Sequence, residues 1–315
     1  MTKVEADFDG GWDAAPMLPR QQQGSPQHLL LTLLGDYWYG HQESLPSRVL
    51  TAVLAEFGIS YQGARAAISR LSRRGLLEWS RTDGSPGYRL TKYANSVLTE
   101  GLQRILQFGT TCSTWDRLWT VVVFSVPESQ RELRYVARTQ LRWLGFSSLY
   151  NGTWVSPWER CDEAARLLSE VGVHHAVVLR SSLSESSPES PASAWDLDAL
   201  AEAYNDFLQE FSPLLERARS GDIGTAEALL KRILLMDAWR QFPAIDPDLP
   251  GELLPSDFPR SKARAMFAEL YDTLGPLAEI RIRAIFSNHA PEQAKSISSH
   301  VAARRTAMEP GQERS

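Results

Sequence analysis

The sequence predicts an α+β protein of three domains: an N-terminal winged helix-turn-helix, a central ferredoxin-like α/β sandwich and a C-terminal helical domain. A basic helix followed by a hairpin predicts the first domain, an alternation of strands and helices predicts the second, and long helical periodicities predict the third. The 315 residues leave room for two or three domains, and the hydrophobic and charged fractions are those of a globular protein.

The first domain is expected to span residues 26–110, after a polar, mobile lead at residues 1–25. Its first helix is the apolar segment HLLLTLLGDYW, and a second helix occupies SLPSRVLTAVLAEFG. In this second helix Pro46 suits the first turn, and Gly58 suits a left-handed C-cap.

A basic helix follows from Ser60, which can cap its N-terminus, to Gly75, which ends it. Its inward stripe is apolar and consists of Ala64, Ala67, Ile68 and Leu71. The segments LLEWSR and GYRL then flank the turn TDGSPG, which predicts a β-hairpin, and a helix from about Thr91 to Phe108 closes the domain. Two helices joined by a glycine turn and followed by a charged hairpin are typical of a winged helix-turn-helix.

Positive charge concentrates on this helix and hairpin, although the chain as a whole carries a net charge of -5. From Tyr61 to Lys92 there are seven cations and two anions, so this segment is +5 and the remainder about -10. Arginine and glutamine can pair with base edges in the major groove, and arginines on a wing can reach phosphates or the minor groove. The residues expected to contact DNA are Tyr61, Gln62, Arg65, Ser69, Arg70, Arg73, Arg74, Arg81 and Arg89.

Three alternatives stay open for this basic surface. Arginines near a helix C-terminus also favour the macrodipole and solubility, which is a purely structural role. Some winged helices bind only proteins, so an adaptor for an acidic partner is a second alternative. RNA is the third, and it is disfavoured because no aromatic stacking platform accompanies the basic face, Tyr61 excepted.

The second domain is expected at residues 114–182, where RLWTVVVFSVP indicates a buried strand and ESQRELRYVARTQLRWLGF an amphipathic helix. SSLYNGTWVSPW adds one or two short strands, CDEAARLLSEVG a helix and HHAVVLRSS a last strand. This βαββαβ order predicts a ferredoxin-like sandwich, which we expect to act as a dimerisation sheet. A flexible Ser/Pro-rich linker is expected at residues 183–194.

The third domain is expected at residues 195–287, where helical periodicity is interrupted by the proline-rich loop PAIDPDLPGELLPSDFP. The polar tail at residues 288–315 is expected to be disordered. The acidic N-terminus does not resemble a secretory signal, and no apolar stretch is long enough to span a bilayer. Cys112 and Cys161 lack close partners, so we expect a cytoplasmic protein without disulfides or structural zinc.

Three successive parts of the chain resemble the PaaX family of transcriptional regulators, in the family's order, over about residues 27–285. LLLTLLGDYW, ISYQGARAAISRLSRRGLLEWSR and GYRLT together resemble its N-terminal domain. WDRLWTVVVFSVPESQRELRYVARTQLRWLGFSSLYNGTWVSPW is similar to its central domain, whose fold is like that of the Cas2 CRISPR protein. DPDLPGELLPSDFP is similar to the signature of its C-terminal helical domain.

The resemblance implies a homodimeric repressor that binds a partly palindromic operator in double-stranded DNA and is released by an aryl- or acyl-CoA thioester. Arg180 and Arg240 could neutralise phosphates of such an effector, with ordinary salt bridges as the alternative. The segment LLMDAWRQF carries Asp237 and Ala238 where members of the family usually have a His-Glu pair. A different effector therefore stays open, as does a pathway-specific regulator of a secondary-metabolite cluster, including an activator.

The Cas2 likeness raises a metal-dependent nuclease as an alternative function. Such nucleases need a metal-binding aspartate at the end of the first strand, whereas TVVVFSVPE has Ser125 near that point and a helix-starting Glu128 beyond it. The adjacent His174 and His175 point to opposite faces of a strand and so do not chelate one metal. No phosphate loop and no nucleophile–base pair is visible, so neither an enzyme nor a cofactor is expected.

Overall fold

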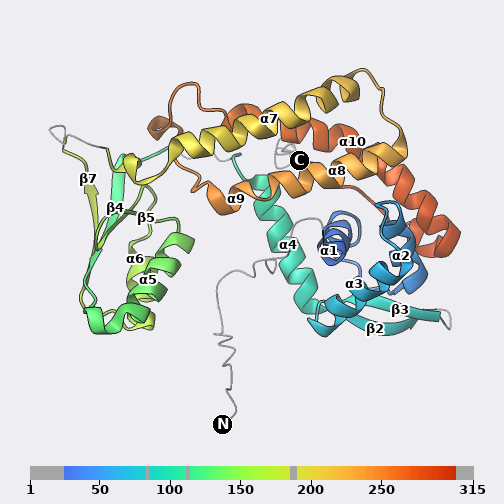
Figure 1. Cartoon of the computed structure of the whole chain (residues 1–315), viewed down its shortest axis with the longest axis horizontal. Coiled ribbons are helices and arrows are strands. Elements are labelled where there is room, and N and C mark those ends of the chain that lie inside the picture. The colour runs from blue at the N-terminus through green and yellow to red at the C-terminus, as the bar shows by residue number, and fades with distance from the viewer. Residues whose placement is uncertain (1–24, 83–84, 111–113, 185–189, 303–315) are drawn as a thin grey trace, which may run out of the picture. The chain divides into compact units, whose positions relative to one another are not determined.

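A computed structural model of the chain describes residues 25–82, 85–110, 114–184 and 190–302 (Figure 1). These residues divide into two compact units. The first unit comprises the chain up to residue 107 together with residues 212–240 and the chain from residue 266. The second unit comprises residues 108–211 and 241–265. The C-terminal helices are therefore shared between the units, whereas the sequence suggested a separate third domain.

The N-terminal part of the first unit has the expected winged helix-turn-helix order. Its elements are α1 (Pro26–Tyr37), β1 (Leu45–Pro46), α2 (Ser47–Ala55), α3 (Tyr61–Arg73), β2 (Leu77–Thr82), β3 (Ser85–Leu90) and α4 (Lys92–Gln107). The three strands form an antiparallel sheet in the order β1-β3-β2. Buried side chains of α1, α2 and α3 form the core beneath this sheet, as the helical spacing of their apolar residues requires.

The turns around α3 follow the predicted backbone chemistry, with one difference. Gly58 and Gly75 have φ values of +71° and +69°, the left-handed conformation expected after α2 and after α3. The Ser60 hydroxyl accepts a hydrogen bond from the Gly63 N–H at 3.1 Å and so caps α3. Pro46, expected inside the first turn of α2, instead lies in β1 opposite Gly87 and precedes the helix.

The C-terminal helices of the first unit pack on the winged helix. They are the end of α7 (Leu197–Arg219), α8 (Thr225–Trp239) and most of α10 (Arg260–His289). The short helix α11 (Pro291–Ala294) follows, and Ile297 and Ala302 beyond it are buried. The expectation of a disordered tail is thus wrong for residues 288–302, because these side chains are covered by the unit; residues 303–315 lie outside the described range.

The second unit contains the expected ferredoxin-like sandwich. Its order is β4 (Leu118–Phe124), a 3-10 turn η1 (Glu128–Gln130), α5 (Arg131–Trp143), β5 (Ser147–Tyr150), β6 (Thr153–Ser156), α6 (Cys161–Val171) and β7 (Ala176–Ser182). The sheet is antiparallel with the order β5-β6-β4-β7, and both helices cover the same face (Figure 1). Val122 and Trp154 of the sheet meet Leu141 of α5 and Leu168 of α6 in the core.

Two further segments of the second unit lie outside the sandwich order. In the expected linker, residues 190–194 include a 3-10 turn η2 (Pro191–Ala194), and Ala192 is buried against Trp119 and Val155; residues 185–189 lie outside the described range. The proline-rich loop contains α9 (Phe242–Ile245) and a 3-10 turn η3 (Gly251–Leu253). Asp246 anchors this loop by accepting a hydrogen bond from the Tyr204 hydroxyl at 2.6 Å. Among the described residues no helix combines the length and the apolar character needed to cross a membrane.

Candidate nucleic-acid interface

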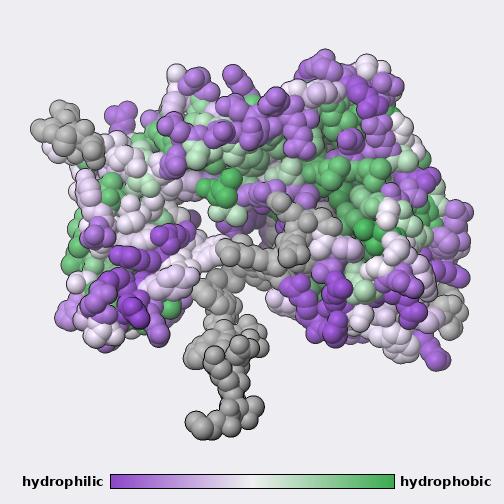
Figure 2. Space-filling view, in the orientation of Figure 1, coloured by the Kyte–Doolittle hydropathy of each residue, from purple (hydrophilic) through white to green (hydrophobic). Residues whose placement is uncertain are grey.

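The solvent-facing side of α3 carries most of the residues expected to contact DNA. Its apolar stripe is fully buried against the rest of the first unit, so the opposite side faces solvent. Hydrophilic residues dominate the surface at this end of the unit (Figure 2). All the predicted residues are exposed, namely Tyr61, Gln62, Arg65, Ser69, Arg70 and Arg73 in α3, Arg74 at its C-cap, Arg81 in β2 and Arg89 in β3.

Most of the guanidinium groups on this surface carry uncompensated charge. Among the residues that the structure describes, no ion pair joins a carboxylate to Arg65, Arg73, Arg74 or Arg81. Arg70 donates a hydrogen bond to Gln27 Oε1 at 3.1 Å, a neutral acceptor that orients the guanidinium and leaves its charge free. Unpaired arginines can donate bidentate hydrogen bonds to phosphates or base edges without first breaking an internal pair.

Arg89 differs from the other predicted contacts because it already has a carboxylate partner. Its Nε lies 2.6 Å from Glu78 Oε1, and the two residues face each other across the β2–β3 ladder. This cross-strand pair stabilises the hairpin and offsets the charge of Arg89. Arg81 is therefore the stronger candidate for a backbone contact from the wing.

Two exposed aromatic rings accompany the arginines, and sequence reasoning missed one of them. Tyr61 is 63% exposed, and the Arg65 guanidinium lies 5.9 Å from the centre of its ring. Trp79 is 59% exposed, with the Arg81 guanidinium 6.0 Å from its ring centre. Both contacts are cation–π pairs that hold a guanidinium over an aromatic face at the surface. The spacing of Trp79 and Arg81, two apart on a strand, was the available signal that they share one face.

Comparison with known proteins identifies the family of the chain. Three family profiles match successive parts of the chain: PaaX-like protein at residues 25–94, PaaX protein central Cas2-like domain at residues 112–194, and PaaX-like protein C-terminal domain at residues 195–284. The curated "Transcriptional repressor PaaX" of Escherichia coli (strain K12) is 27% identical over 259 residues, which cover 78% of this chain and 76% of that protein.

The chain belongs to the PaaX family. It is a distant homologue of the Escherichia coli repressor and thus a PaaX-like transcriptional regulator. A solved structure, uncharacterized protein Rv0674 from Mycobacterium tuberculosis, has a similar fold with a TM-score of 0.55 at 20% identity, covering 83% of this chain and 98% of that one.

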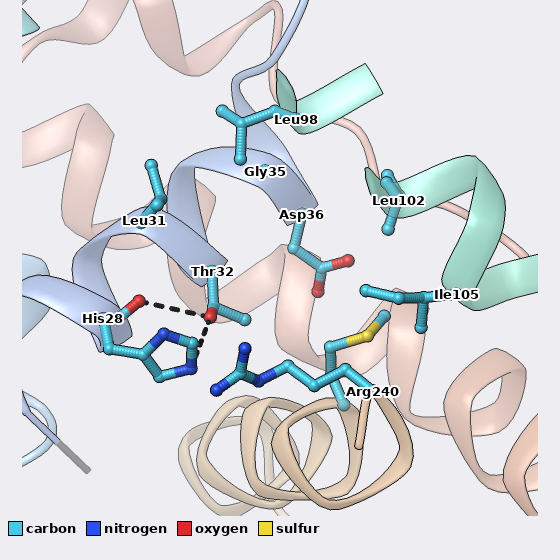
Figure 3. A pocket seen from close by; sticks show the side chains of 10 residues that line it. His28, Leu31, Thr32, Gly35, Asp36, Leu98, Leu102, Ile105 and Arg240 are labelled. Carbon is cyan, nitrogen blue, oxygen red and sulfur yellow. Dashed lines mark hydrogen bonds between the residues drawn. The ribbon is translucent and has the colours of Figure 1, made fainter. Parts of the chain in front are cut away.

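A small cleft in the first unit of this PaaX family member contains one of the two predicted effector residues (Figure 3). Residues of α1 and α4 face each other across it, and Arg240, at the end of α8, lies beside His28. Its volume of about 30 Å³ leaves room for about two water molecules, so an acyl group would have to displace its walls. The lining residues are His28, Leu31, Thr32, Gly35, Asp36, Leu98, Leu102, Ile105, Met236 and Arg240.

Charged groups at the edge of the cleft are paired with one another. Asp237 Oδ1 accepts a hydrogen bond from Arg240 Nε at 2.7 Å and pairs with His28 Nε2 at 2.6 Å. Burial alone would raise the pKa of Asp237, but the hydrogen bonds from His28 and Arg240 outweigh it and hold the pKa below its usual value. Asp237 therefore ties α8 to α1.

Arg180, the other predicted effector residue, lies in the second unit within a ring of internal partners. Its guanidinium pairs with Asp116 at 2.7 Å and Glu159 at 3.1 Å, and it donates a hydrogen bond to Thr120 Oγ1 at 2.9 Å. The hydrogen bond from Arg180 holds the pKa of Asp116 below its usual value. This geometry favours the salt-bridge role for Arg180 over binding of an effector phosphate.

The residues considered for a nuclease do not assemble a metal centre in the described part of the chain. No group of three or more His, Cys, Asp or Glu side chains there is placed to hold a metal ion. The N–H of Ser125, at the end of the first strand, donates a hydrogen bond to the His175 carbonyl, so this strand end is used for pairing. Glu128 lies in η1 and pairs with Arg134 at 2.9 Å.

Proposed function

We propose that this PaaX-like protein is a sequence-specific DNA-binding regulator, acting as a repressor on a partly palindromic operator. The observation that carries the proposal is the set of exposed arginines on α3 and β2 that have no carboxylate partner among the described residues. A helix with this surface fits the major groove, where Gln62 and Arg70 offer bidentate donors to base edges. Arg81 on the wing supplies a sequence-independent phosphate contact.

The binding form is proposed to be a homodimer joined through the second unit. The sheet face opposite α5 and α6 exposes apolar side chains: Val123, Val177 and Leu179 are 43%, 58% and 40% exposed. Val123 lies directly opposite Val177, and Val121 directly opposite Leu179, so these residues form one patch. Covering such a patch with the same patch of a second copy is a two-fold, self-complementary interface. Two copies of α3 would then read half-sites about 34 Å apart.

The effector is proposed to be an aryl- or acyl-CoA thioester that releases the protein from its operator. Support comes from the resemblance to the PaaX family and from Arg240, a cation that lines the cleft between α1 and α4. Ligand entry there would separate Asp237 from its partners and shift α1, which packs directly on α3. The alternative function is an activator of a secondary-metabolite cluster. It would respond to another effector and have the opposite effect on transcription, and it would use the same DNA-binding surface.

Pull-out of genomic fragments by the purified protein, followed by sequencing, tests the proposed function. We expect enrichment of a few promoter fragments that share one partly palindromic site, and binding that weakens steeply as salt increases. The genes controlled by the bound promoters would then suggest candidate effectors, and each candidate is tested for release of the protein from its DNA site. Uniform recovery of all fragments would contradict sequence-specific binding. Capture of acidic proteins without retention of duplex would favour the adaptor alternative.

A further inference from the structure

A second cluster of arginines lies in the other unit, along α5 of the ferredoxin-like sandwich. Positions 131, 135, 138 and 142 fall within an arc of about 60° on a helix with 3.6 residues per turn, so their side chains form one row. Three of the four are arginines, and the fourth is Tyr135, which is 71% exposed. The row extends over about 16 Å of helix axis at 1.5 Å per residue. Hydrophilic side chains cover this helix in the surface view (Figure 2).

The arginines of this row are not engaged by the unit's own carboxylates. Among the described residues no ion pair holds Arg131, Arg138 or Arg142, and the Arg138 Nε is buried without a hydrogen-bond partner. The Arg142 guanidinium instead lies 5.4 Å from the centre of the Trp154 ring, a cation–π contact that leaves its charge without a carboxylate partner among the described residues. The nearby pair of Arg134 and Glu128 shows that a carboxylate within reach is used where one is present.

Sandwich folding does not require this row. The core side of α5 is provided by Ala137 and Leu141, which are fully buried, while the arginine row lies on the flank and keeps two of its cations exposed. Concentrating like charge on a helix flank costs folding free energy through repulsion, and i, i+4 pairs of the same sign are destabilising. A chain with a net charge of -5 that accumulates cations here therefore offers a site for an anionic ligand.

We propose that the row formed by Arg131, Tyr135, Arg138 and Arg142 binds the sugar-phosphate backbone of duplex DNA, as a second contact that adds affinity without sequence selectivity. The inference rests on the proposed function, since it assigns the second unit to the same ligand as α3. Phosphates of one strand recur about every 3.4 Å along the duplex axis, so the row can meet several of them. Guanidinium groups bind phosphates bidentately, and an exposed tyrosine can donate to phosphate or pack on a sugar.

The test compares salt dependence of duplex binding by full-length variants, measured by fluorescence anisotropy on a duplex of several helical turns. Arg131→Ala/Arg142→Ala should lower the magnitude of the slope of log K against log salt by about 2, and weaken binding to operator and unrelated duplex alike. Arg131→Lys/Arg142→Lys keeps the charge and should retain most of the slope. Lys262→Ala/Lys295→Ala removes two cations outside the row, both exposed, and should leave the slope unchanged.

Each outcome decides between the two proposals. An unchanged slope in the Arg131→Ala/Arg142→Ala variant, with Arg81→Ala still weakening binding, overturns the inference and leaves the proposed function standing. An equal fall of the slope in the Lys262→Ala/Lys295→Ala variant also overturns the inference, because net charge would then account for the effect. Wild-type protein that retains no duplex refutes both. Light scattering and thermal melting of each variant confirm that assembly and folding are intact, and the inference fails where a lower slope appears only with loss of the wild-type oligomer.

Discussion

Arg232 of α8 and Asp36 of α1 form an ion pair in the interior of the first unit, with Nε and Oδ2 3.0 Å apart and side chains 0% and 1% exposed. The Tyr271 hydroxyl also donates a hydrogen bond to Asp36, and Arg232 donates to the main-chain carbonyls of Tyr271 and His300. Burial and the Asp36 charge raise the pKa of Tyr271 well above its usual value, so it remains a neutral donor. One polar network thus ties the C-terminal helices to the first helix of the DNA-binding fold.

Removing one partner of this pair should be costly. Arg232→Met leaves the Asp36 carboxylate buried with the Tyr271 hydroxyl as its remaining partner, and we expect the free energy of unfolding to fall by about 3–5 kcal/mol. Urea denaturation of both proteins measures the difference. Lys295→Ala breaks an exposed ion pair with Glu292 and should cost less than about 1 kcal/mol, which makes it the surface-pair control.

The double variant Asp36→Leu/Arg232→Met separates the contribution of the ion pair to stability from the contribution of side-chain packing. With both charges gone no uncompensated carboxylate remains, so the double variant should be more stable than Arg232→Met alone. If the double variant loses as much free energy of unfolding as Asp36→Leu and Arg232→Met lose together, this account of the network is contradicted.

Gly275 in α10 is required by the same network. A Cβ at this position would lie 2.6 Å from Arg232 Nη1, and the guanidinium is held on its other side by Asp36. We expect Gly275→Ala to destabilise the protein by about 1–3 kcal/mol, although alanine favours a helix over glycine. In the Arg232→Met background, adding Gly275→Ala should be nearly neutral or stabilising relative to Arg232→Met alone, because the obstructing atom is then absent.

Local sequence rules predicted the elements of this fold but not this network. The βαββαβ order, the α3 stripe and the glycine turns at Gly58 and Gly75 follow from periodicity and backbone preference, which act over a few residues. Asp36 and Arg232 are 196 residues apart. Arg232 is one of several charged residues in α8, whereas Asp36 is the one carboxylate in the apolar helix α1. Such a charge is a signal of a buried partner, but the sequence alone does not say which opposite charge it meets.

At the candidate nucleic-acid interface, helical spacing predicted which residues are exposed but not which of them are paired. Helical spacing identified the solvent-facing side of α3, and every predicted residue there is exposed. Cross-strand pairing depends on register, which the hairpin composition does not specify, so the engagement of Arg89 by Glu78 was not foreseen. The helical tail past Ser287 was missed because its polar composition hid the few side chains, such as Ile297, that pack against the unit.

Glu78 on the wing should restrain DNA binding. Glu78→Gln removes a negative charge beside the expected phosphate path and releases Arg89, so we expect affinity for any duplex to rise severalfold at low salt. Arg89→Ala should weaken binding less than Arg81→Ala, because Arg89 must first leave its carboxylate. Glu100→Gln makes the same charge change at an exposed site on α4 and is the control. Equal gains from both glutamate variants would point to net charge alone.

Gln62 and Arg81 should have separable effects on recognition. Gln62→Ala removes a bidentate donor–acceptor from α3, and we expect a loss of about 1–3 kcal/mol of discrimination at one base pair with the salt slope intact. Arg81→Ala should weaken binding to all duplexes alike and lower the slope by about 1. Competition binding with single-base operator variants measures both. An Arg81 variant that changes sequence preference and retains non-specific affinity would reverse these roles.

The bridge from His28 to Asp237 should make stability depend on pH in the acid range. A carboxylate whose pKa is lower in the folded state stabilises the protein above its unfolded pKa of about 3.9 and ceases to do so as pH falls through the lower folded value. Asp237→Asn should therefore reduce the free energy of unfolding by about 1–2 kcal/mol at neutral pH, and the two proteins should converge as pH falls below the lowered folded pKa of Asp237. Denaturant unfolding over this range checks the convergence. Asp206→Asn changes an exposed aspartate of α7 and should leave the free energy of unfolding unchanged at both neutral and acid pH. A difference in stability between wild type and Asp237→Asn that stays constant down to the lowest pH would mean that the carboxylate acts through packing rather than charge.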